Sequence, residues 1–222
     1  MLRIFLLIST FSITIVKSQS TFKEISHLKV IKSTAENHEI TTLNFLNFNT
    51  INSDNFNDLI SNYLKNDDLN LPVIISDVNN NKKFMENVQD EERSLNLIFI
   101  ASRDDFIEFS YQFLSIWSER FEGFFIIFYD NANYSMRKEI FKKFWDFFIY
   151  KVVIVRQDEN STVIDTFLPY DTQICNSIEP VEIARLEDPG TSEITSLFPH
   201  KFTNFNTCNI TITTFDSEAI FL

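Results

Sequence analysis

The amino-acid sequence predicts an α/β fold, with an open and mostly parallel β-sheet that carries helices on both faces. The middle of the chain alternates short apolar runs with longer segments in which apolar residues recur every three or four positions. The short runs are apolar throughout, which is typical of strands buried on both faces. Such strands need helices on each side, so the predicted order of elements and the predicted burial agree.

Two helices are expected before this alternating region. The first covers residues 21–31, with Phe22, Ile25 and Leu28 on one side. The second begins at Ser53 or Asp54, because apolar residues then recur at helical spacing. They are Phe56, Leu59, Ile60, Tyr63 and Leu64. Between the two helices the pattern is weak, and the pairing of Asn with Phe around residues 44–48 carries little weight.

The apolar runs are expected to be the strands of the sheet. They span Val73–Ile75, Leu95–Ile100, Phe124–Tyr129, Val152–Val155 and Val163–Leu168. Helices are expected over residues 84–93, from Ser102 and from Ser135, and Asp105 stands where a capping box has Glu. The inward-facing residues expected are Phe106, Phe109, Phe113 and Trp117 in one helix and Met136, Ile140, Phe144 and Phe148 in the next. The result is similar to one lobe of a periplasmic-binding protein or to a flavodoxin-like fold.

Residues 1–18 are predicted to be a secretory signal peptide. Arg3 precedes an apolar run over residues 4–16, and small and polar residues follow from Lys17. The run is shorter than the ~20 residues that a membrane span needs. A buried amino-terminal strand or helix and an uncleaved anchor are the alternatives. Removal of these residues leaves 17 basic against 31 acidic side chains and changes the net charge from −12 to −14.

The rest of the chain divides into three predicted parts. Residues 19–169 form the α/β domain, which Pro169 ends. Residues 170–206 have no strong periodicity and carry Pro180, Pro189 and Gly190, so an irregular linker is expected. Residues 207–222 contain an alternating segment at 207–215, which predicts a strand. A lone strand needs a partner.

No catalytic, cofactor-binding or metal-binding constellation is predicted. The chain has two Gly residues, too few for a glycine-rich phosphate loop. The three His residues are not at ligand spacing from one another or from Cys, and each is expected at the surface. Asp130 follows a strand, but its surroundings fit a turn. The acidic charge argues against nucleic acid as a partner. An enzyme is therefore not expected.

Cys175 and Cys208 are a candidate disulfide, because a Cys pair in an oxidising compartment is usually joined. Free or intermolecularly paired thiols are the alternative. Asn133, Asn160 and Asn209 each begin an Asn-X-Ser/Thr sequon and are candidate glycosylation sites.

The segment from Leu197 to Phe215 resembles the one that joins the amino-terminal domain to the ligand-binding domain in insect ionotropic receptors, divergent relatives of ionotropic glutamate receptors. The matching residues are Leu197, Phe198, Pro199, Lys201, Asn204, Cys208, Thr214 and Phe215. The segment from Thr166 to Tyr170, with Cys175 after it, is also similar to the sequence that precedes this linker in the family. Asn206 and Thr207 depart from it by replacing the usual His-Gly, and the Pro-Pro expected after Phe215 is missing.

The resemblance implies a subunit of a chemosensory, ligand-gated cation channel. This chain would hold its signal peptide, its amino-terminal domain and the first strand of a truncated ligand-binding domain, without the pore. Other receptor subunits, including a co-receptor, are the implied partners, with a small-molecule ligand as a further candidate. The domain would lie on the extracellular side of the plasma membrane, with a role in assembly or ligand binding. The alternative is a free secreted α/β protein that binds a small ligand, if the chain is complete as written.

Overall fold

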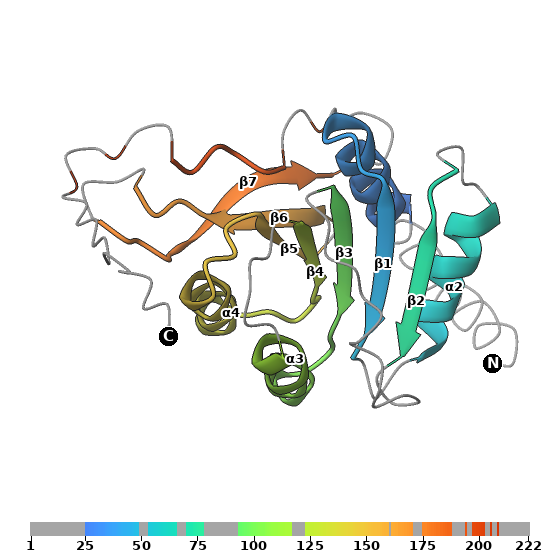
Figure 1. Cartoon of the computed structure of the whole chain (residues 1–222), viewed down its shortest axis with the longest axis horizontal. Coiled ribbons are helices and arrows are strands. Elements are labelled where there is room, and N and C mark those ends of the chain that lie inside the picture. Colours follow the sequence, from blue (N-terminus) through green and yellow to red (C-terminus); the bar gives the residue numbers. More distant parts are fainter. Residues whose placement is uncertain are drawn as a thin grey trace, which may run out of the picture.

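The computed structural model describes residues 25–48, 53–65, 70–77, 93–116, 123–159, 161–170, 175–187, 194, 197–202, 205 and 208. In these residues one β-sheet separates two layers of helices (Figure 1). The predicted fold class, an α/β fold with an open, mostly parallel sheet, is confirmed.

The sheet has seven strands in the order β2-β1-β3-β4-β5-β6-β7. Their bounds are Thr42–Asn47 (β1), Val73–Asp77 (β2), Ser94–Phe99 (β3), Phe124–Phe128 (β4), Val152–Asp158 (β5), Ser161–Phe167 (β6) and Pro180–Leu186 (β7). The first five pair in parallel, whereas β6 and β7 are antiparallel to their neighbours. The parallel order 2-1-3-4-5 is that of flavodoxin-like doubly wound sheets.

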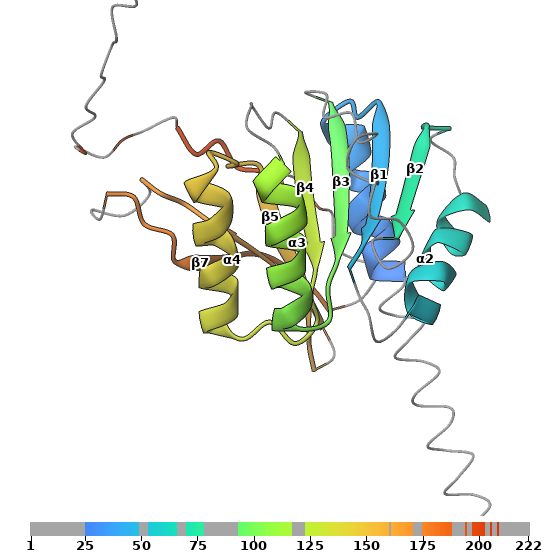
Figure 2. The same ribbon diagram turned by 60° about the horizontal axis from the view of Figure 1, so that its bottom comes forward.

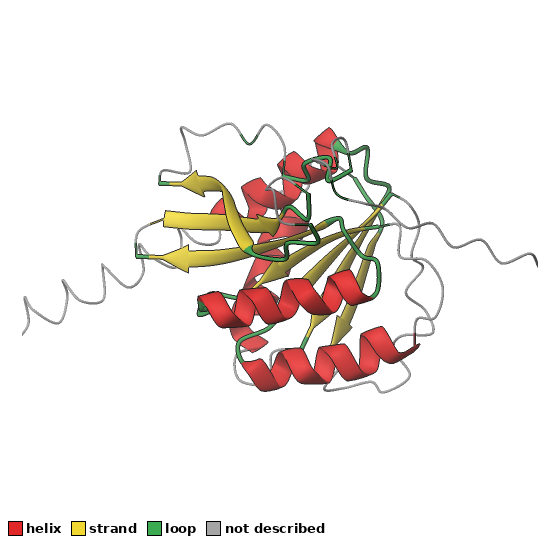
Figure 3. Ribbon diagram, turned by 90° about the vertical axis from the view of Figure 1, so that its left-hand side faces the viewer, coloured by secondary structure: helices red, strands yellow, loops and turns green. Residues whose placement is uncertain are grey.

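The helices cover both faces because the strand order reverses between β1 and β3. Right-handed crossovers then place α2 (Ser53–Lys65) on one face, and α3 (Arg103–Ile116) and α4 (Tyr134–Asp146) on the other. Figures 2 and 3 show α3 and α4 side by side on their face. A helix over residues 25–37 joins α2 on the opposite face, where both helices contribute to one apolar layer.

The core consists of two apolar layers, one on each face of the sheet. In β4, Phe125 and Ile127 pack under α3 and α4, whereas Phe124, Ile126 and Phe128 face the other layer. All five side chains are buried. This explains why the sequence of β4 is apolar at every position: each residue faces a covered side of the sheet.

One buried amide pair interrupts these layers. Asn44 of β1 and Asn96 of β3 are fully buried neighbours, and Asn44 Nδ2 donates to Asn96 Oδ1 at 2.9 Å. Asn96 Nδ2 also lies 3.4 Å from the backbone oxygen of Phe124. The Asn-Phe alternation of this segment therefore has a structural basis in a central strand, β1, that the sequence analysis did not predict.

Several predicted elements need correction. The first helix includes residues 25–37 and so continues beyond the predicted end at Ile31; its buried residues include Val30 and Ile31, whereas Ile25 is exposed. Phe148 is 82% exposed rather than inward, because α4 has ended and the residue adopts a positive φ of 60°. Of the histidines that were expected at the surface, His27 is buried against Phe128.

The carboxyl-terminal part also differs from the prediction. The expected irregular segment 170–206 contains β7, which pairs with β6 at the edge of the sheet. The predicted signal peptide, the helix at 84–93 and the strand at 207–215 lie outside the described residues, apart from Arg93, which is in a turn, and the irregular position Cys208. No described helix has the length and hydropathy needed to cross a membrane.

Candidate functional site

Doubly wound sheets carry their binding sites at the carboxyl ends of the parallel strands, most often where the strand order reverses. Here that point lies between β1 and β3, next to the start of α3. Asp105 Oδ2 accepts hydrogen bonds from the backbone N–H groups of Ala101 and Ser102, both at 2.9 Å, and Ser102 Oγ accepts one from Asp105 N at 3.1 Å. The predicted capping arrangement is therefore present. Because the protein's own carboxylate occupies these donors, the start of α3 offers little to an external anion.

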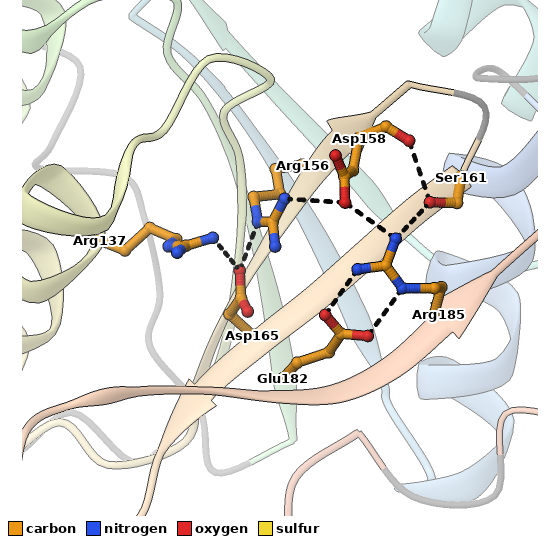
Figure 4. Close-up of polar contacts among 7 residues, drawn as sticks. All are labelled: Arg137, Arg156, Asp158, Ser161, Asp165, Glu182 and Arg185. Atoms are coloured by element: carbon orange, nitrogen blue, oxygen red, sulfur yellow. Dashed lines mark hydrogen bonds and ion pairs between the residues drawn. The ribbon is translucent and has the colours of Figure 1, made fainter.

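The carboxyl ends of β4 and β5 carry a different set of groups. Asn133 caps α4, and Arg137 follows within the first turn of that helix. Arg156 projects from β5, and Asp165 comes from the neighbouring antiparallel strand β6. Asp165 Oδ2 accepts from Arg137 Nη1 at 3.1 Å and from Arg156 Nε at 2.8 Å (Figure 4). One carboxylate thus holds two guanidinium groups from different elements.

This arginine–aspartate triad is largely withdrawn from water. The side chain of Asp165 is 3% exposed, and those of Arg137 and Arg156 are 14% and 15% exposed. Arg156 Nη1 also lies 3.8 Å from Asp158 Oδ2, so a second carboxylate faces this pair of arginines. Arg137 Nε is buried and has no hydrogen-bond partner within the described part of the chain. The triad therefore keeps one buried N–H donor that is unused among the described residues.

A second and more exposed set of charges continues the network, as Figure 4 shows. Arg185 of β7 makes two hydrogen bonds to Glu182, at 2.9 and 2.8 Å, and one to Asp158 at 2.9 Å. These bonds from Arg185 lower the pKa of both Asp158 and Glu182. Arg185 also donates to Ser161 Oγ at 2.8 Å, so it ties β7 to the β5–β6 hairpin.

The surface beside this network is hollowed. Asp158, Glu159, Ser161, Arg185 and Glu187 line an open depression of about 490 Å³. A second open groove, of about 460 Å³, runs between α3 and α4 and includes Ile107, Tyr111 and Lys142 in its lining. Three of the five residues that line the first are carboxylates and none belongs to the triad, whereas the second is lined mainly by outward faces of two helices.

The chemical capacity of the triad follows from its donors. Guanidinium groups with free N–H bonds bind carboxylates through short, charge-assisted hydrogen bonds, often in pairs. Partial burial strengthens such bonds because water competes less. The triad also has a structural effect, since it joins α4 to β5 and β6. It supplies a fixed, cationic and partly buried pair of donors at the edge where this fold binds ligands.

The residues singled out in the sequence lie mostly elsewhere. Cys175 and Cys208 form a disulfide with a Cα–Cα distance of 5.5 Å. Asn133 is exposed at the start of α4, and Asn160 and Asn209 lie outside the described residues. Searching the described residues finds no group of three His, Cys, Asp or Glu that could hold a metal ion.

The residues of the linker resemblance pack into the domain itself. Leu197 and Phe198 belong to the apolar layer that contains the helix over residues 25–37, and Phe198 meets Phe124 edge-on at 5.0 Å. Lys201 is buried, donates to Thr166 Oγ1 at 3.0 Å and lies 3.5 Å from the centre of the Phe167 ring. Burial lowers the pKa of Lys201 to about 6. Asn204, Thr214 and Phe215 lie outside the described residues.

Sequence reasoning did not single out Arg137, Arg156, Asp165 or Arg185. A signal for one of them was present. Asp165 lies inside an otherwise apolar and hydroxylated strand, at a position whose neighbours two residues away, Val163 and Phe167, are buried. A carboxylate at such a position requires a cationic or hydrogen-bonding partner.

Comparisons with known proteins give one match. A family model described as "Putative ionotropic receptor, ligand binding domain" matches residues 27–204. No curated protein and no solved structure matches the chain significantly. The matched range runs from the first described helix to the segment after Lys201, so it includes the whole sheet and all residues of the charged network.

Proposed function

Because the chain belongs to the family of ionotropic receptor ligand-binding domains, we propose that it is the extracellular part of a chemosensory ionotropic receptor subunit. The observation that carries this proposal is the family match over residues 27–204. The Cys175–Cys208 disulfide fits an oxidising, extracellular location. A small molecule is then the expected ligand.

The ligand-binding part of this proposal concerns the Arg137–Asp165–Arg156 triad. Its two guanidinium groups lie at the carboxyl edge of the sheet, and Arg137 Nε is a buried donor without a partner among the described residues. These features favour a small ligand with a carboxylate, which would bind the free N–H groups while Asp165 holds the arginines in place.

A thermal-shift screen of the full chain tests this part. Carboxylates of three to eight carbons are compared with amines and alcohols of the same size. The carboxylates should raise the Tm, because a ligand that binds only the folded state stabilises it. Arg156→Gln should abolish the rise, whereas Arg103→Gln, a change at an exposed arginine on α3, should keep it. Equal shifts from alcohols, or an unchanged response in Arg156→Gln, would contradict the assignment.

The receptor context is a separate part of the proposal. The resemblance of residues 197–215 to an insect receptor linker supports an amino-terminal position in a longer, ligand-gated cation channel subunit, where the domain contributes to assembly with other subunits. Transcript sequence beyond the codon for Leu222 tests it. The proposal expects a continuing frame with apolar segments of about 20 residues, enough to span a membrane. A well-supported stop codon at that point would favour a free secreted binding protein.

A further inference from the structure

We propose that Asn133 carries an N-linked glycan in the secreted protein, and that the same side chain still caps helix α4. Among the three sequons, Asn133-Tyr134-Ser135 is the one whose acceptor lies in the described part of the chain. All three of its residues are exposed. The proposal is independent of ligand binding and needs only export of the chain.

In the Asn133 amide, one atom caps α4 and a different atom can carry the glycan. Asn133 Oδ1 accepts a hydrogen bond from Met136 N at 2.9 Å, and the backbone of Asn133 is extended, with φ −68° and ψ 170°. An N-linked glycan bonds to Nδ2, the other atom of the amide. Because Oδ1 is the atom that accepts the capping hydrogen bond from Met136 N, Nδ2 is available for the glycan without loss of the cap.

The glycosylation reaction needs no reactant from this protein other than the Asn133 amide. The Asn133 Nδ2 nitrogen bonds to the anomeric carbon of a lipid-linked oligosaccharide, loses one proton and displaces the lipid pyrophosphate. One N–H remains on the nitrogen, and Oδ1 keeps its lone pairs. The Ser135 hydroxyl completes the acceptor motif. Since the residue is modified as an unfolded segment and later exposed at a helix start, folding does not bury the sugar.

A glycan at this place affects the edge that holds the charged network. Arg137 follows Asn133 by four residues, about one helical turn. The glycan root is therefore next to the side of the Arg137–Asp165–Arg156 triad that α4 supplies. A bulky, hydrated sugar there keeps this end of α4 in solvent, so another subunit cannot pack against it.

The experiment uses the full chain produced in insect cells, with protein analysed from both cells and medium. A peptide N-glycosidase active on insect glycans is applied in heavy-oxygen water, which converts a glycosylated Asn to labelled Asp. Label is expected at Asn133. Ser135→Ala and Asn133→Asp should each lower the mass by one glycan, whereas Asn160→Gln should leave the label at Asn133. An unlabelled Asn133, or a Ser135→Ala chain of unchanged glycan mass, would overturn the proposal.

Variants that carry no glycan at residue 133 test the cap. Asn133→Asp keeps an oxygen acceptor for Met136 N and should melt like Ser135→Ala, which keeps an unmodified Asn133. Asn133→Ala loses it, which costs about 1 kcal/mol and should lower the Tm by about 2–4 °C. Equal Tm values for the Ala and Asp variants would show that the side chain does not cap α4.

Discussion

The centre of the sheet, formed by β1, β3 and β4, and its edge, formed by β5, β6 and β7, are held together by different forces. Strands β1, β3 and β4 contain no charged residue, and apolar side chains cover both of their faces. Strands β5, β6 and β7 carry Arg156, Asp158, Asp165, Glu182 and Arg185, joined in one network. The centre of the sheet thus depends on burial of apolar area, and the β5–β7 edge adds paired charges that also form the candidate binding edge.

The largest effect is expected from the apolar part. Phe125→Ala removes a fully buried ring of β4 that packs edge-on against Phe144 at 5.5 Å. The free energy of unfolding should fall by about 3–5 kcal/mol, from lost apolar burial and the remaining cavity. Urea unfolding followed by circular dichroism measures it. Phe148→Ala, at an exposed position, is the matched control and should change stability by at most about 0.5 kcal/mol.

The next effect concerns the charged part. Asp165→Asn removes the negative charge between Arg137 and Arg156 and keeps the side-chain shape. Stability should fall by about 2–4 kcal/mol, somewhat less than for a fully buried pair because both arginines retain some exposure. Asp158→Asn, at an exposed ion pair, should have a much smaller effect on stability. Similar losses in both variants would mean that burial of Asp165 has no special effect.

A third prediction concerns the pH dependence of stability that the buried Lys201 confers. The pKa of Lys201 is about 6 in the folded chain against 10.5 for an unperturbed lysine. Between these values the unfolded chain binds more protons, so stability should rise with pH by at most about 1.4 kcal/mol per unit and fall toward pH 6. Unfolding at pH 6.5 and 8.5 measures the slope.

Two variants isolate the lysine. Lys201→Met should remove its share of the slope, because no amine remains to titrate. Lys201→Arg keeps a positive charge that cannot be lost and should destabilise the fold at both pH values. A slope that survives in Lys201→Met would assign the pH dependence to other groups.

The last prediction concerns the loss of stability on changing the buried amide pair of Asn44 and Asn96. Asn96→Leu leaves Asn44 Nδ2 without its acceptor and should cost about 1–3 kcal/mol. The double change Asn44→Leu with Asn96→Leu should cost less than the sum of the single changes, because no amide is left unpaired. A double-mutant cycle in urea gives the coupling. Additive losses would show that the two amides do not depend on each other.

The same contrast explains how far the sequence could predict the fold. Strands β3, β4 and β5 were predicted because their cores are apolar runs, and the start of α3 because Ser102 and Asp105 form a local capping pattern. Strand β1 was missed since Asn44 and Asn47 interrupt its apolar run, although both side chains are buried. Strand β7 begins at Pro180 and is mostly exposed, so it has no strong pattern.

The candidate site was missed for a related reason. Arg156 and Arg137 lie 9 and 28 residues from Asp165 in the sequence. Their convergence depends on the antiparallel pairing of β6 and on the packing of α4, neither of which short-range periodicity encodes. Only Asp165, as a carboxylate between buried positions, indicated that a partner was needed. The disulfide pair was easier to propose, because the chain has two cysteines.

The central claim is that the two arginines beside Asp165 bind a carboxylate ligand. Nuclear magnetic resonance of the arginine Nε–H groups tests it most directly, during titration of the nitrogen-15-labelled chain with a six-carbon monocarboxylate. The account predicts saturable shifts of the Arg137 and Arg156 signals and little change for Arg103, which pairs with Glu139 at the surface. Absent shifts, or equal linear shifts in all three arginines, would contradict it.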